Sequence, residues 1–167
     1  MGSKFSVGNI VKDHFRTLRS FRTEKIELSS VSINFVLPAI VATIFVYFEL
    51  MIRNTEFDVI LTAFSVFAAL LLNLMILLYS VLNRESEKKD EQKNKIKMRV
   101  LKETYSNIEF SVLTSVIIIV IILLMLFIPY YFYFDLTASF IVYFLIFVFI
   151  TTLFMVLKRM HSIMSRL

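Results

Sequence analysis

The sequence predicts an all-α integral membrane protein, a bundle of four transmembrane helices with an N-terminal amphipathic helix and cytoplasmic helical extensions. Three observations predict this class: the overall composition, the lengths of the apolar stretches, and the segregation of basic residues. Hydrophobic residues make up 58% of the 167 residues, and the mean hydropathy is +0.78. Ordinary globular domains are about 45–50% apolar. Much of this chain, which is short enough for a single domain, is therefore expected to lie in lipid.

Four long apolar stretches carry the fold prediction. They are residues 31–52, 59–82, 110–130 and 136–157. Each is about 20–24 residues long, which matches a hydrocarbon core of roughly 30 Å crossed at 1.5 Å per residue. A membrane strand would need only about 10 residues and would alternate in polarity. These stretches do not alternate, so we predict helices, with a kink at Pro38 in the first one.

Basic residues predict the orientation of the four helices. Of the 18 Lys and Arg residues, Arg53 alone falls outside the N-terminal arm (residues 1–28), the central linker (residues 83–109) and the C-terminal tail. Four crossings place these three segments on the same side of the membrane. Because basic loops are retained inside the cell, we expect both termini and the linker to be cytoplasmic.

The N-terminal arm has the pattern of an amphipathic helix. Its apolar residues recur at helical spacing, and they are Val7, Ile10, Val11, Phe15, Leu18 and Phe21. Lys12, Arg16 and Arg19 fall on another face. Such a helix suits the surface of an anionic leaflet. It suits packing against the central linker equally well, and docking of a soluble partner is a third interpretation.

The central linker divides into two parts. Residues 83–95 are polar and mixed in charge, which is typical of a solvated turn or helix end. Residues 96–108 regain apolar positions at helical spacing, and no Gly or Pro interrupts them. We therefore expect the third span to begin as a cytoplasmic helix. Its apolar stripe is expected to pack on the N-terminal helix, and partner docking is the alternative.

Asn73 lies near the centre of the second predicted span. An amide in hydrocarbon needs partners, usually on a neighbouring helix. We interpret Asn73 as a bond between helices, and the alternative is the lining of a narrow pore. Residues 129–135, PYYFYFD, predict an aromatic belt at the outer interface, with a ligand platform as the alternative. No predicted span carries Asp, Lys, Arg or His at mid-depth, which disfavours proton relays and voltage sensors.

The sequence offers no pattern of an enzyme. It has no cysteine, phosphate-binding glycine loop, metal-ligand cluster or nucleophile elbow. We expect no catalytic residues, cofactor or metal, and we interpret His14 and His161 as solvated surface residues. The candidate residues for binding a cytoplasmic partner are basic, and they are Lys93, Lys95, Lys97, Arg16 and Arg19.

Two stretches, KDHFRTLRSFRTEKIE at 12–27 and LTAFSVFAALLLNLMILLYSV at 61–81, together with the four-span layout, resemble the membrane subunit of the Kiwa antiphage defence system. The resemblance covers about the first half of the chain. It implies a homo-oligomer, a tetramer, in the bacterial inner membrane. It also implies a cytosolic, nucleic-acid-binding effector as partner, with no direct nucleic-acid binding by this chain.

Three function classes follow from these observations. The first is a sensor and anchor subunit that detects events at the envelope and recruits the cytosolic effector. The second is a small pore-forming effector or ion channel that depolarises the membrane. The third is a structural or assembly subunit with no activity of its own.

Overall fold

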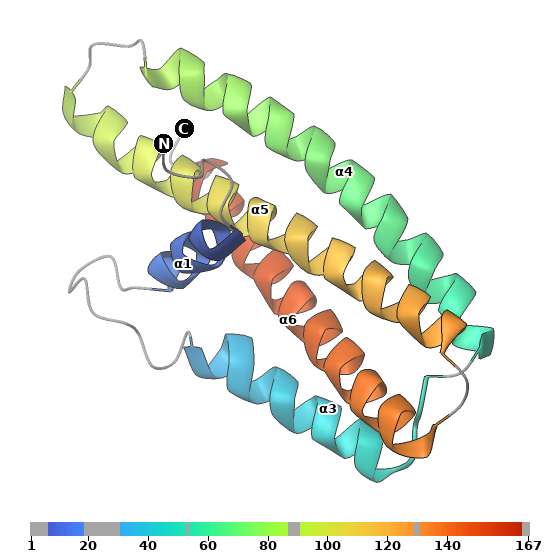
Figure 1. Cartoon of the computed structure of the whole chain (residues 1–167). Coiled ribbons are helices and arrows are strands. Elements are labelled where there is room, and N and C mark those ends of the chain that lie inside the picture. Colours follow the sequence, from blue (N-terminus) through green and yellow to red (C-terminus); the bar gives the residue numbers. More distant parts are fainter. Residues whose placement is uncertain (1–6, 19–30, 53, 87–90, 129–130, 165–167) are drawn as a thin grey trace.

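A computed structural model describes residues 7–18, 31–52, 54–86, 91–128 and 131–164. All of the regular structure in these ranges is helical (Figure 1). The elements are α1 (Val7–Thr17), the π-helical turn η1 (Ser32–Val36), α3 (Leu37–Tyr47), α4 (Asn54–Ser86), α5 (Glu91–Phe127) and α6 (Phe132–Met164). The predicted all-α class is confirmed, and the helices form a bundle of the membrane type.

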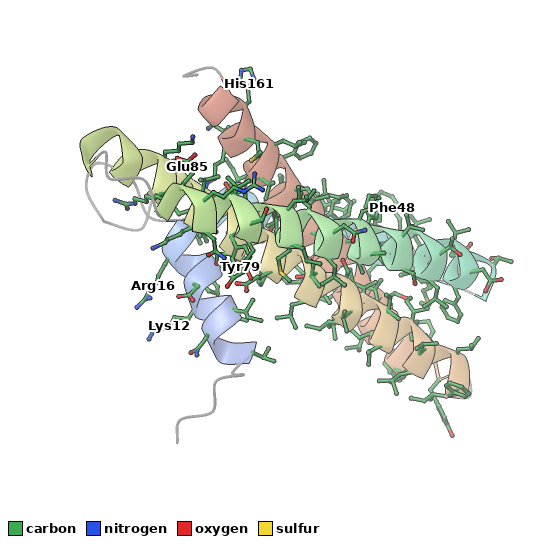
Figure 2. The ribbon with its side chains drawn as sticks, turned by 90° about the horizontal axis from the view of Figure 1, so that it is seen from above. Lys12, Arg16, Phe48, Tyr79, Glu85 and His161 are labelled. Carbon is green, nitrogen blue, oxygen red and sulfur yellow. The ribbon has the colours of Figure 1, made fainter. Side chains whose placement is uncertain are left out.

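The four apolar helices stand in an open row in the order α3, α6, α5, α4 (Figure 1). Each helix packs on the next one in this order, whereas α3 and α4, at the two ends of the row, do not pack on each other. Figure 2, seen from above, shows α4 lying over α5. The short helix α1 crosses the row and packs on α5. Among the described elements, α4 therefore has α5 as its single neighbouring backbone.

A heptad pattern of large side chains forms the core between these helices. On α4 the buried positions recur every seven residues, at Phe57, Phe64, Leu71 and Leu78. The same interval separates Val142, Phe149 and Val156 on α6. A seven-residue repeat keeps one stripe facing its neighbour along nearly antiparallel helices. Small residues such as Ser111, Ser115 and Ser139, all fully buried, allow close approach of the helices.

Three helices are long and apolar enough to cross a membrane, and they lie in α4, α5 and α6. The fourth apolar helix, Ser32–Tyr47, is shorter. It ends five residues before the predicted boundary at Ile52 because Glu49 adopts a left-handed conformation, with φ of 56°. Leu50 N–H then donates to the carbonyl of Phe45, and Glu49 N–H to that of Val46. This is a Schellman motif, formed here without the usual glycine.

Pro38 is accommodated by a widened turn at the start of the first span. It is the second residue of α3, directly after η1. Proline has no N–H to donate, and its ring collides with the carbonyl four residues earlier in a regular α-helix. In η1 the N–H of Leu37 reaches back to the carbonyl of Ser32, one residue further than in an α-helix. The wider turn therefore accommodates the proline ring at the start of the span.

The predicted helical character of the linker is confirmed over residues 91–109, which form the first five turns of α5. In Figure 1 the end of α4, the start of α5, the end of α6 and the helix α1 lie at one end of the row. We call this the basic end. Tyr133, at the start of α6, lies at the opposite end.

We expect the basic end to face the cytoplasm. Tyr133→Cys and Lys12→Cys place single thiols at exposed positions at the two ends of a chain that contains no cysteine. A membrane-impermeant thiol reagent added to intact cells should label Tyr133→Cys only. Both variants should be labelled after lysis, which serves as the control. Labelling of Lys12→Cys alone in intact cells would reverse the orientation.

Candidate functional site: a buried polar cluster at the basic end

Buried polar side chains from three helices meet at the basic end. His14 and Asn107 are fully inaccessible to solvent, and Thr17 is 5% exposed. His14 and Thr17 come from α1, Asn107 from α5, and Arg159 joins them from α6. Burial of unpaired polar groups is costly, so their hydrogen bonds decide how these helices are joined.

The amide of Asn107 is the centre of this cluster. Its Oδ1 atom lies 3.0 Å from His14 Nδ1 and accepts a second hydrogen bond from Thr17 Oγ1 at 2.8 Å. Its Nδ2 atom faces the sulfur of Met155 on α6 at 3.8 Å. One side chain of α5 therefore contacts polar groups on both α1 and α6.

Arg159 closes the cluster from the side of α6. Its Nη2 atom donates to the carbonyl oxygen of Thr17, at the end of α1, at 2.6 Å. The same nitrogen lies 3.4 Å from Glu103 on α5, and Glu103 also pairs with Arg99 at 3.0 Å. A cation at a helix C-terminus interacts favourably with the helix dipole. Arg159 thereby fixes α1 against both α5 and α6.

His14 is neutral in this environment. Its ring stacks on Phe110 with centroids 3.9 Å apart and planes inclined by 6°, and the edge of Phe35 lies nearby. Burial lowers the pKa of His14 to about 4, an effect that the bond to Asn107 opposes and the charge of Arg159 reinforces. Because Asn107 offers an oxygen, Nδ1 carries the proton. The other ring nitrogen, Nε2, has no partner among the described residues.

The sequence-based interpretation of His14 as a solvated residue is wrong. The helical spacing assigned the buried face of α1 to the apolar residues, yet His14 and Thr17 are buried with Leu18 while Phe15 is 45% exposed. A signal for the observed burial is present in the sequence, because the spacing of His14 and Thr17 places two polar residues on one face of the helix, next to Leu18. Val7 and Phe15 remain available to lipid, with Phe15 stacked on Phe35 at the start of the first span.

The residues predicted to bind a partner lie in different settings. Arg16 is exposed and pairs with Asp13 on its own helix at 3.2 Å. Lys97 on α5 pairs at 3.2 Å with Glu85, which is largely buried near the end of α4. Lys93 and Lys95 belong to α5, but their side chains, like the whole of Arg19, lie outside what the structure describes. The ion pair between Lys97 and Glu85 therefore joins α5 to α4.

A groove of about 570 Å³ runs between α1 and α5 beside the cluster. Arg16 lines its α1 side, and Lys102, Ser106 and Glu109 line its α5 side. Ser106 is 7% exposed, and its hydroxyl has no partner among the described residues. The groove therefore combines cations and carboxylates at the basic end, and its lining includes the predicted partner-binding residue Arg16.

Asn73 lies far from this cluster, near the middle of α4, and its side chain is exposed on the outer surface of the row. The predicted bond to a neighbouring helix is not made within the described part of this chain. An unpaired amide in hydrocarbon costs about 2–7 kcal/mol, depending on the reference state. The amide of Asn107 thus has hydrogen-bond partners within the chain, whereas the amide of Asn73 has none among the described residues.

No protein-family model matches the sequence, and no curated protein or solved structure is detectably similar to it. The functional argument therefore rests on the geometry described above. Among the described residues, no group of three or more His, Asp or Glu side chains is placed to hold a metal ion.

Acidification is expected to release α1 from the cluster. The released helix binds a proton at His14 more tightly than the docked helix, in which burial lowers the pKa to about 4. Docking is therefore strongest above roughly pH 6.5 and weakens toward pH 4, by about 2 kcal/mol at pH 5. We expect the labelling rate of buried Leu18→Cys, normalised to exposed Lys12→Cys, to rise between pH 7 and pH 5.

His14→Gln is the matched control, because glutamine retains a hydrogen-bonding amide and does not titrate. Its normalised labelling rate should stay constant over the same pH range. An equal rise in the glutamine variant would show that another group controls the release of α1.

Proposed function

We propose that the protein is a membrane-embedded sensor and anchor subunit of a bacterial antiphage defence complex. In this proposal it lies in the bacterial inner membrane as a homo-oligomer, with the basic end in the cytoplasm. There it recruits and regulates a cytosolic, nucleic-acid-binding effector. The assignment to antiphage defence, and to a tetramer, derives from the resemblance of residues 12–27 and 61–81 to the Kiwa membrane subunit.

The observation that carries this proposal is the preassembled platform of helices at the basic end. The first five turns of α5, residues 91–109, extend beyond its apolar segment. Lys97 joins them to Glu85 of α4, Glu103 joins them to α6, and Asn107 joins them to α1. A surface held by such bonds loses little conformational entropy when a partner docks, which favours binding.

The distribution of chain between the two ends supports docking at the basic end. A standard interface buries about 800 Å² on each partner. At the opposite end the helices are joined only by residues 48–53 and 128–131. The basic end offers α1, the α1–α5 groove and the projecting turns of α5, so a stable soluble partner finds more surface there.

The continuity of α5 supports a route for the sensing function. This helix runs from Glu91 to Phe127 without a described break, from the platform through the apolar region. It also lies between α4 and α6 in the row. A displacement of α5 in the membrane therefore moves the surface that holds Lys97 and Lys102, together with the buried Asn107.

A pore-forming effector is the second candidate, and the position of Asn73 favours it. An exposed amide near the middle of α4 would face a central axis if several copies assembled around that helix. Within one chain, the buried hydroxyls of Ser111, Thr114 and Ser115 bond to carbonyls of their own helix. These hydroxyls are thus already satisfied, whereas the Asn73 amide is exposed and has no partner among the described residues.

We expect the triple variant Lys93→Glu, Lys95→Glu, Lys97→Glu to impair partner binding while the protein still inserts in the membrane. Charge reversal at the rim of an interface mainly slows association and raises its sensitivity to salt. The test is purification of the protein from its native host in mild detergent, followed by native mass measurement at low and moderate salt.

Two controls separate surface charge from structure. A second triple variant, Lys12→Glu, Arg84→Glu, Lys158→Glu, changes the net charge equally at three other exposed positions of the basic end. Adding Glu85→Lys to the first variant restores an ion pair with residue 97. Equal co-purification of wild type and first variant would contradict this placement of the site. Absence of any cytosolic partner would overturn the sensor proposal in favour of the pore.

A further inference from the structure

Asn73 stands on the face of α4 that no part of the described chain covers. The residues that pack on the core, Leu71 and Leu78, lie two positions before and five positions after it, on roughly the opposite side of the helix. Its neighbours on the outer face, Leu70 and Leu77, are 59% and 64% exposed. In the membrane this face meets lipid or another protein.

The open face is a consequence of the position of α4 in the row. Only 11% of the most apolar part of α4 is buried, against 39% for α5. Lipid suffices to cover exposed Leu, Ile and Val side chains. Hydrocarbon provides no hydrogen bond for the Asn73 amide, which has two donors and an acceptor.

The residues around Asn73 repeat at the spacing of a helix-packing seam. Exposed positions follow one another at intervals of four and three, and they are Thr62, Val66, Ala69, Asn73, Ile76 and Ser80. Intervals of this kind keep one stripe in contact with a partner helix. Small and hydroxylic side chains at such positions allow two membrane helices to approach closely.

We propose that this seam packs against the same seam of a second copy of the chain, with the two Asn73 amides hydrogen-bonded to each other. Rotation about an axis along the membrane normal places each residue of one copy at the same depth in the other. An amide both donates and accepts, so Asn73 is complementary to itself. A lipid headgroup remains at the interface and does not reach this depth.

This inference deepens the proposed function by naming the surface through which copies of the subunit associate. It does not depend on a cytosolic partner. The protein can therefore be tested alone in membranes, and its failure is distinguishable from a failure to recruit the effector.

Disulfide crosslinking tests the seam in this cysteine-free chain. Two cysteines form a disulfide only when their Cα atoms lie within about 7 Å. We expect Ala69→Cys to form a crosslinked dimer when isolated membranes are oxidised. Val120→Cys, exposed on another membrane-spanning helix, α5, is the control and should remain monomeric. Crosslinking of Ala69→Cys no stronger than that of Val120→Cys would overturn the proposal.

The role of the amide is tested by adding Asn73→Leu to Ala69→Cys. Loss of a hydrogen bond between membrane helices is expected to weaken association about fivefold, which lowers the crosslinked fraction at low protein-to-lipid ratio. Asn73→Gln retains the amide and should retain more crosslinking than the leucine variant. Equal crosslinking in all three would show that Asn73 does not hold the seam.

Reagent access separates a packed seam from a pore. In a packed seam Asn73→Cys is dry, and an impermeant charged thiol reagent should fail to label it in non-oxidised membranes. In a water-filled ring the same thiol would react. Rapid labelling of Asn73→Cys, accompanied by ion leakage, would overturn the direct contact and support the pore-forming candidate.

Discussion

Lipid provides no hydrogen bonds, and this constraint decides where the polar side chains of the protein lie. Burial by protein at the basic end imposes the same requirement, and one solution is that of Asn107, whose amide contacts His14, Thr17 and Met155 from two other helices. The buried hydroxyls illustrate another, since Ser111 and Thr114 return their protons to their own helix. Asn73 has neither solution within the described chain. Asn107 is therefore stabilised by hydrogen bonds within one copy of the chain, whereas Asn73 would need a hydrogen-bond partner from outside it.

The basic end and the α4 edge of the open row differ in whether another helix covers them. At the basic end, α1 completes the structure by covering α5, and its polar residues connect it to α6 through Arg159. At the edge formed by α4, no described helix covers the outer face. Assembly through α4 would leave the basic end free, because Lys97 and the α1–α5 groove lie beyond the apolar part of the seam. The proposed contact between copies and the proposed docking of a soluble partner therefore use separate surfaces of the protein.

Sequence patterns predicted the helical class, the linker helix and the approximate limits of α4 to α6, because long apolar periodicity is determined locally. They did not predict the features that depend on a single side chain or backbone angle. The end of α3 depends on the left-handed conformation of Glu49, and the sequence lacks the glycine that usually indicates such a helix end. The burial of His14 depends on Asn107, 93 positions away in sequence. The outward position of Asn73 could not be predicted either, since periodicity identifies the faces of a helix without saying which neighbours cover them.

The short first span has a consequence for the surrounding bilayer. The five residues of η1 and the eleven of α3 extend roughly 24 Å, less than a hydrocarbon core of roughly 30 Å. At the other edge of the row, α4 contains an apolar helix of 31 residues. Lipids beside α3 must shorten or tilt while those beside α4 need not, so hydrophobic mismatch is concentrated on one side. We therefore expect a change in membrane thickness or tension to act on α3 more strongly than on α4.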